Sequence, residues 1–139
     1  MAALLTPTLI AMLHQRAAEA ARNSYSPYSH FRVGAAILLE GGQIVAGTNV
    51  ENASYRLTSC AEQAAIAAGV SLHGPAIRIL AVAVANLNGA ACMPCGACRQ
   101  TILEFATPDT AIFYPNAAGE IVSTTLGDLL PAAFRLNPE

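Results

Sequence analysis

Hydrophobic residues near the start of the chain recur at the spacing of an amphipathic helix. From about Thr8 to Asn23 the sequence is rich in alanine, and apolar residues return about every three or four positions. They form one stripe: Ile10, Leu13, Ala17 and Ala21. Pro27 and the serines between Ser24 and Ser29 interrupt this pattern, so we predict that the helix ends before them.

The rest of the pattern predicts strands that alternate with helices. The continuous apolar run from Ile77 to Ala85 is typical of a strand that is buried on both faces. The predicted strands are Phe31 to Leu39, Gln43 to Asn49, Ile77 to Ala85, Ala111 to Tyr114 and Glu120 to Thr124, with turns at Gly41-Gly42 and Asn116 to Gly119. The predicted helices are Cys60 to Ala68, ending before Gly69, Cys95 to Phe105, stopped by Pro108, and a last turn at Leu126 to Leu130.

Helices that alternate with strands indicate an α/β fold. We predict a three-layer α/β/α sandwich around a mixed five-stranded sheet. The chain has 139 residues without an internal repeat or a low-complexity linker. We therefore expect residues 1–139 to form a single domain.

Composition narrows the possible partners. Hydrophobic residues make up 54% of the chain and charged residues only 12%, against about 25% charged in a typical soluble domain, so we expect apolar surface to be buried between subunits. No run reaches the roughly 20 apolar residues of a membrane span, and the N-terminus lacks the features of a signal peptide. With a net charge of −2 and only seven Lys and Arg, the chain lacks the basic cluster that polynucleotide binding requires. A small-molecule substrate is therefore favoured.

The cysteines indicate metal chemistry. Four cysteines without secretory signals suggest a reducing compartment, and metal or catalytic roles rather than disulfides. Three of them, with one carboxylate, lie in two segments: Cys60-Ala61-Glu62 and Pro94-Cys95-Gly96-Ala97-Cys98. Catalytic zinc sites use three protein ligands and keep a fourth position open. The pattern, with Cys in place of His at the first ligand, matches the signature of zinc-dependent nucleobase deaminases, in which the glutamate carries protons.

The predicted helices favour this interpretation but leave another one open. Cys60 and Cys95 each open a predicted helix, whose N-terminus stabilises a thiolate. Cys92, Cys95 and Cys98, however, form a C-x2-C-x2-C pattern that also begins a bacterial iron–sulfur run. A non-enzymatic zinc or iron–sulfur module would require Cys92 as a fourth ligand and would leave Glu62 without a role. We therefore predict that Cys92 is not a ligand.

Five segments occur in one order along the chain, and together they resemble the small, homotetrameric class of cytidine deaminases. They run from Tyr25 to Ala36, Asn49 to Tyr55, Cys60 to Glu62, Pro94 to Gln100 and Leu129 to Phe134. The resemblance implies zinc-dependent hydrolytic deamination of cytidine and 2′-deoxycytidine to uridine and 2′-deoxyuridine with release of ammonia, a step of pyrimidine salvage. It also implies one zinc ion per chain and a cytoplasmic homotetramer with shared active sites.

The resemblance implies a role for each matching residue. The zinc ligands would be Cys60, Cys95 and Cys98, and Glu62 would transfer protons. The substrate-binding residues would be Phe31 on the pyrimidine face, Asn49 and Glu51 on the ribose hydroxyls, and Ala61, Tyr55 and Phe134, with Tyr55 and Phe134 in a pocket that a neighbouring subunit completes. A sister enzyme acting on a cytosine-bearing antibiotic would share both zinc motifs. The segments around Phe31, Asn49 and Glu51 favour an unmodified nucleoside.

Two positions depart from the family's pattern. The residue after Glu62 is commonly arginine, and here it is Gln63. A cation near the sulfurs would offset the charge of three thiolates, so we expect helix N-termini and Arg99 to take over this role, with a weaker hydrogen bond from Gln63 to a thiolate. Arg56 stands where a small residue is usual. We expect the histidines at the surface or at helix caps: His14, His30 and His73.

Overall fold

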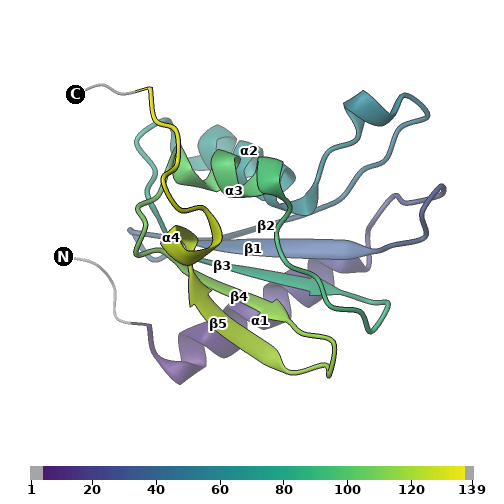
Figure 1. Cartoon of the computed structure of the whole chain (residues 1–139), viewed down its shortest axis with the longest axis horizontal. Helices are drawn as coiled ribbons and strands as arrows, with labels where there is room; N and C mark the ends of the chain where they lie inside the picture. The colour runs from purple at the N-terminus through teal and green to yellow at the C-terminus, as the bar shows by residue number, and fades with distance from the viewer. Residues whose placement is uncertain (1–4, 137–139) are drawn as a thin grey trace.

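A five-stranded mixed sheet forms the middle layer of the computed structural model, which describes residues 5–136 (Figure 1). The strands are β1 (Val33–Leu39), β2 (Ile44–Thr48), β3 (Ile79–Asn86), β4 (Ala111–Pro115) and β5 (Ile121–Thr125), in the order β2-β1-β3-β4-β5. β3 and β4 run parallel, while β1 pairs antiparallel with β2 and β3, and β5 pairs antiparallel with β4. The predicted mixed five-stranded sheet is confirmed.

Helices cover both faces of this sheet (Figure 1). α1 (Pro7–Ala21) packs on one face, whereas α2 (Ala61–His73), α3 (Gly96–Leu103) and the single turn α4 (Leu126–Leu129) belong to the other. A short 3-10 helix, η1 (Tyr55–Leu57), precedes α2. The three predicted layers are therefore present. Within the described residues, no helix has both the length and the apolar character needed to cross a membrane.

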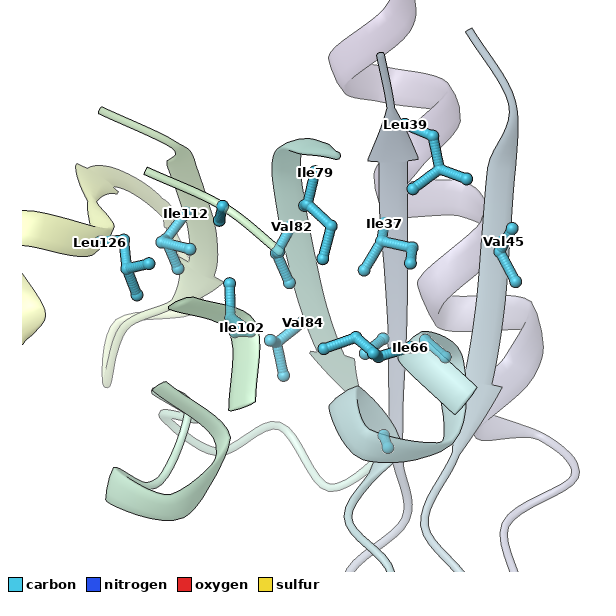
Figure 2. Close-up of a cluster of buried hydrophobic side chains, with 14 of the residues drawn as sticks. Ile37, Leu39, Val45, Ile66, Ile79, Val82, Val84, Ile102, Ile112 and Leu126 are labelled. Carbon is cyan, nitrogen blue, oxygen red and sulfur yellow. The ribbon is translucent and has the colours of Figure 1, made fainter. Parts of the chain in front are cut away.

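Strand alternation divides the buried side chains into two cores, because successive residues of a strand point to opposite faces. Ala36 and Leu38 of β1 join Leu13 and Ala17 of α1 in the smaller core. The larger core lies between the sheet and the helices of the other face (Figure 2), and it includes Ile37, Leu39, Val45, Ile66, Ile79, Val82, Val84, Ile102, Ile112 and Leu126. This burial on both faces explains why β1 and β3 read as nearly continuous apolar runs.

α2 continues past the glycine that we predicted would end it. The helix runs through Gly69 to His73 and is followed by Gly74, whose φ of 91° is left-handed. Gly69 is buried, and a Cβ atom there would lie 3.3 Å from Ile37 and 3.4 Å from Ile77. Gly69 thus allows close packing of the helix on the core. The predicted end was wrong because the sequence does not show which face of the helix meets the sheet.

The other predicted elements are present, with ends that differ by a few residues. β1 begins at Val33, so Phe31 lies in the loop before the strand. α3 ends at Leu103, well before Pro108. The predicted turn from Asn116 to Gly119 joins β4 to β5.

Two glycines allow helices on opposite faces to approach the sheet closely. A Cβ atom at Gly47 in β2 would lie only 2.4 Å from the backbone nitrogen of Ala65 in α2. A Cβ atom at Gly34 in β1 would lie 1.9 Å from the backbone oxygen of Ala17 in α1. No side chain fits at either position without moving a helix. The contact at Gly47 therefore fixes the position of α2 over the sheet.

Candidate active site

Three cysteine sulfur atoms converge at the N-termini of α2 and α3. The sulfur atoms of Cys60, Cys95 and Cys98 all lie within 4.8 Å of one another. Cys60 is the N-cap of α2 and Cys95 is the N-cap of α3, as the sequence predicted. Cys98 lies within the first turn of α3 and is buried, and its backbone N–H donates a hydrogen bond of 3.4 Å to the sulfur of Cys95.

The sulfur positions fit the geometry of a zinc site. With Zn–S bonds of about 2.3 Å, tetrahedral coordination places the sulfur atoms about 3.8 Å apart. The sulfur atoms of Cys60 and Cys95 are 4.0 Å apart. Three cysteines also leave a fourth coordination position open, as in catalytic zinc sites. The cluster is therefore compatible with one zinc ion per chain.

Cys92 lies outside this cluster in the part of the chain that the structure describes. Its side chain is half-buried against the larger core, and its backbone N–H donates to the carbonyl of Pro115 at 3.1 Å. Burial raises the pKa of the Cys92 thiol to about 11. A thiol in this environment behaves as a small hydrophobic group, which agrees with the prediction that Cys92 is not a ligand.

Contacts among the thiols favour the thiolate form of Cys60. A hydrogen bond from the Cys98 thiol lowers the pKa of Cys60 to about 7, although burial opposes this change. The same hydrogen bond, together with burial, raises the pKa of Cys98. Because cysteine binds metals as the thiolate, zinc binding here releases protons.

Glu62 lies in the first turn of α2, next to the sulfur cluster but outside the set of converging sulfurs. Its side chain is only 4% exposed. Burial raises the pKa of Glu62, and hydrogen bonds from its own backbone N–H and from Cys98 partly oppose this effect. A buried carboxyl group next to a cluster of potential metal ligands is a good candidate for proton transfer.

The two side chains expected near the thiolates make other contacts. The side-chain Oε1 of Gln63 accepts a hydrogen bond of 3.2 Å from the backbone N–H of Cys60, which stabilises the first turn of α2. The guanidinium of Arg99 donates bonds of 2.8 Å to the carbonyls of Pro94 and Leu129, and its third nitrogen contacts a methionine sulfur. Arg99 therefore ties the loop before α3 to the end of α4. The expectation that Arg99 helps to offset the thiolate charge stays a prediction.

The amide of Asn49 is largely occupied by contacts within the chain. Its Oδ1 accepts hydrogen bonds from the hydroxyl of Ser24 at 2.5 Å and from the backbone N–H of Val33 at 3.1 Å. Its Nδ2 donates to the carbonyl of Phe31 at 2.8 Å. An amide NH₂ has two donors, and the second N–H of Asn49 has no hydrogen-bond partner within residues 5–136.

Glu51 is anchored by the loop that precedes β1. Its Oε1 accepts hydrogen bonds from the backbone N–H groups of Tyr28 at 2.9 Å and Ser29 at 3.1 Å, and its Oε2 accepts from the hydroxyl of Ser29. The bond from the Ser29 hydroxyl is the main cause that lowers the pKa of Glu51. A hollow of about 360 Å³ opens beside it, lined by Tyr28, Ser29, Glu51, Asn52, Tyr55 and Thr58.

Two serines that hold these polar side chains, Ser24 and Ser29, were not among the site residues expected from the sequence. A serine two residues before Phe31, in a turn that also contains Pro27, was the available signal, because serine hydroxyls often bond to backbone groups two residues further on. The long-range partners, Asn49 and Glu51, could not be inferred from this signal.

The remaining predicted substrate-binding residues differ in burial. Phe31 is half-buried against the larger core, and Ala61 is 1% exposed at the first position of α2. Tyr55 on η1 is 80% exposed and Phe134 is 69% exposed. The carbonyl of Phe134 accepts a hydrogen bond of 2.9 Å from Gln100, which attaches the C-terminal segment to α3.

One histidine lies where we did not expect it. The Nε2 atom of His14 is buried and has no hydrogen-bond partner among the described residues. Its ring packs edge-on against Phe113 at 5.7 Å, and burial lowers its pKa. The surface prediction was wrong for His14 because the face of α1 that meets the sheet is wider than the apolar stripe. His73, in the last turn of α2, is exposed as predicted.

Comparison with known proteins identifies the family of this chain. The family model for the cytidine and deoxycytidylate deaminase zinc-binding region matches residues 8–114. A cytidine deaminase of Mycobacterium tuberculosis is 46% identical over 126 residues, which cover 91% of this chain and 90% of the relative. The chain belongs to the cytidine and deoxycytidylate deaminase family. The three converging cysteines and Glu62 all lie within the matched residues.

Solved structures of this deaminase family share the fold. A crystal structure of cytidine deaminase from Mycobacterium tuberculosis has a TM-score of 0.80 at 45% identity, and the match covers 91% of this chain and 98% of that one. A cytidine deaminase structure from Burkholderia pseudomallei has a TM-score of 0.81 at 38% identity, covering 94% of this chain and 100% of that one. The protein is therefore a hydrolytic deaminase with a zinc-binding region.

Proposed function

We propose that this deaminase converts cytidine and 2′-deoxycytidine to uridine and 2′-deoxyuridine, with release of ammonia, as a step of pyrimidine salvage. The observation that carries the proposal is the convergence of three cysteine sulfur atoms next to a buried carboxylate, Glu62. The relatives named as cytidine deaminases support the choice of nucleoside.

In this proposal Cys60, Cys95 and Cys98 hold the zinc ion. When bound, zinc acts as a Lewis acid that lowers the pKa of a water molecule to near neutrality. The N-termini of α2 and α3, where Cys60 and Cys95 are the N-caps, place partial positive charge beside the thiolates. These helix ends offset thiolate charge in a chain that has Gln63 where arginine is usual.

Glu62 is the proposed proton carrier. Its carboxylate takes a proton from the attacking water and passes it to ring nitrogen N3 of the pyrimidine, which makes C4 more electrophilic. The water oxygen bonds to C4, and Glu62 then transfers the proton of the new C4 hydroxyl to the amino group. The C4–N bond breaks, ammonia leaves, and the C4 carbonyl of the product forms. Burial at 4% exposure protects these transfers from bulk solvent.

The nucleoside would be held by residues around the loop that precedes β1. Phe31 would pack on the pyrimidine face, and Glu51 would accept a hydrogen bond from a ribose hydroxyl. Asn49 would contribute its remaining N–H. The side chain of Ala61 is buried, so Ala61 would act through its backbone N–H, which like the other first N–H groups of a helix has no partner within the helix.

The proposed assembly is a homotetramer in which Tyr55 and Phe134 complete the active site of a neighbouring subunit. Both rings are mostly exposed in the isolated chain. Other large apolar side chains are also exposed: Met12, Tyr25, Tyr28, Val50, Leu57, Leu72, Leu87, Met93, Ile121 and Leu136. Such exposure usually marks an interface, which a closed symmetric assembly would bury. Arg56 lies on the same exposed turn as Tyr55. This arginine, which replaces the usual small residue, therefore lies at the proposed interface.

Two further expectations belong to this proposal. Residues 1–139 would act as one domain, since a single sheet joins the strands from Val33 to Thr125. The protein would work in the cytoplasm, where reducing conditions keep cysteines available as thiolate ligands.

Incubation of the zinc-loaded protein with cytidine, 2′-deoxycytidine and other cytosine compounds, including a cytosine-bearing antibiotic, tests the function. Ultraviolet spectra should show conversion of both nucleosides, with matching release of ammonia. Glu62→Gln is the control, because it leaves the three cysteines intact and should retain zinc while losing ~10²–10⁴-fold or more in turnover. Protein that consumes only another cytosine compound would show that the substrate is wrong. Near-normal turnover in zinc-loaded Glu62→Gln would show that the proton-transfer mechanism is wrong.

A further inference from the structure

We infer that Ser29 is a positioning residue that sets the place of the proposed ribose acceptor, Glu51, relative to the proposed ring-stacking residue, Phe31. The inference rests on the proposed function and refines it. The hydroxyl of Ser29 is hydrogen-bonded to both residues: it donates to Oε2 of Glu51 and accepts the backbone N–H of Phe31 at 3.0 Å.

The hydrogen bonds of Glu51 explain why the Ser29 hydroxyl fixes the orientation of the carboxylate. Each carboxylate oxygen offers about two lone-pair sites. Both sites of Oε1 are taken by the backbone N–H groups of Tyr28 and Ser29. Oε2 accepts the Ser29 hydroxyl and has a second site without a partner among the residues that the structure describes. Without that hydroxyl, the carboxylate can pivot about its Oε1 anchor, and its free site is no longer directed to one place.

The segment around Phe31, which Ser29 joins to Glu51, is held by several hydrogen bonds. The carbonyl of Phe31 accepts from the side chain of Asn49 at 2.8 Å, while its N–H is held by Ser29. His30, between Ser29 and Phe31, has a left-handed φ of 59°, and its N–H and C=O are bonded to Ser26 and Asn88 at 2.9 Å each. Left-handed conformations of residues with side chains persist where the surrounding structure determines them strongly. The Ser29 hydroxyl therefore connects Glu51 to a well-defined segment.

A purely local role for Ser29 makes a different prediction. Serine hydroxyls often stabilise turns by bonding to nearby backbone groups, and a serine with only this function would affect stability without acting through Glu51. A positioning role predicts a change in the Michaelis constant that depends on the carboxylate. A double-mutant cycle separates the two roles, since coupled residues give non-additive effects.

The experiment compares Ser29→Ala, Ser29→Thr, Glu51→Ala and the double variant, each loaded with zinc and assayed on cytidine. Ser29→Ala should raise KM about tenfold at nearly constant kcat, the scale of losing one hydrogen bond to a charged group. Ser29→Thr keeps the hydroxyl and should restore a KM near that of the unmodified protein. Ser123→Ala is the matched control, because Ser123 is an exposed serine on β5, at the opposite edge of the sheet from β2.

The double-mutant cycle tests whether Ser29 acts on substrate binding through Glu51. In the Glu51→Ala background, Ser29→Ala should change KM by about twofold or less. An equal rise in KM with and without the carboxylate overturns the inference, as does an unchanged KM in Ser29→Ala when Glu51→Ala raises KM. These outcomes leave the proposed function intact. Unmodified zinc-loaded protein that does not deaminate cytidine would overturn both.

Discussion

Replacing Gly47 with alanine should displace the helix that carries Glu62. A Cβ atom at this position of β2 would lie 2.4 Å from the nitrogen of Ala65 and 2.9 Å from the carbonyl oxygen of Ala61. Both are backbone atoms of α2, so they cannot rotate away as a flexible side chain can. To restore an ordinary contact of 3.4 Å, the helix must move by roughly 1 Å.

The displacement should affect both stability and activity. Overpacking of this kind typically costs about 1–3 kcal/mol, which lowers the melting temperature of a chain of this size by roughly 3–12 °C. α2 also carries Cys60 at its N-cap and Glu62 in its first turn. A shift of about 1 Å in catalytic groups can lower turnover about 10²-fold. We therefore expect a large loss of kcat together with weaker zinc binding.

Gly34→Ala is the matched control. Its Cβ atom would lie 1.9 Å from the oxygen of Ala17 and 2.6 Å from the nitrogen of Ala21 in α1. The clash is at least as severe as that at Gly47, but it falls on the opposite face of the sheet, where α1 carries none of the converging cysteines. This variant should lose stability while its folded fraction keeps near-normal kcat and zinc affinity.

The assay measures thermal unfolding, zinc affinity by competition with a chelator, and kcat of the zinc-loaded protein well below both melting temperatures. Gly47→Ala should lower both zinc affinity and kcat, whereas Gly34→Ala should leave both near normal. If Gly47→Ala loses stability but keeps the zinc affinity and turnover of the unmodified protein, the close contact at Gly47 does not set the position of the active site.

Three further outcomes can be measured. Cys92→Ala should keep about one zinc per chain by elemental analysis, because Cys92 lies outside the sulfur cluster; loss of metal would favour a four-cysteine module. Burial lowers the pKa of His14 from its usual 6.5, so the unfolded chain binds more protons, and stability falls as pH drops below about 6.5. His14→Leu should therefore lose less stability than the unmodified protein in urea unfolding between about pH 7 and 5, unlike the control His73→Leu at an exposed position; an equal acid loss in His14→Leu would contradict this explanation. Phe134→Ala should raise KM without changing zinc content, and light scattering should give the mass of a tetramer. A fully active monomer at micromolar concentration would rule out the shared site.

Much of the architecture could be predicted because helices and strands depend on the pattern of apolar residues in the local sequence. Apolar periodicity located the helices and strands, and their alternation indicated the three layers. The placement of Cys60 and Cys95 at helix N-termini was also predicted and is confirmed. Both cysteines stand directly before helical segments, so the prediction needed no knowledge of contacts between distant residues. The roles of individual residues in binding and catalysis stay predictions until the variants are tested.

The wrong predictions concern residues whose sequence context fits two different structural roles. Gly69 could end a helix or allow the helix to pack closely, and only its neighbours Ile37 and Ile77 decide between these. His14 could be exposed on α1 or partly buried against the sheet, and its contact with Phe113 on β4 decides that. In each case the deciding partner belongs to another element, which the local pattern does not identify.

The sequence by itself indicated which chemistry this protein carries, because the proposed metal ligands and the proposed proton carrier occur in short motifs at predicted helix N-termini. Only the tertiary structure decided how the surrounding polar groups are used. It joined Ser29 to Glu51, occupied most of Asn49 with backbone groups, and directed Arg99 to the carbonyls of Pro94 and Leu129. Hydrogen bonds of this kind depend on distances between segments that are far apart in the chain, and those distances exist only after the sheet and helices have packed.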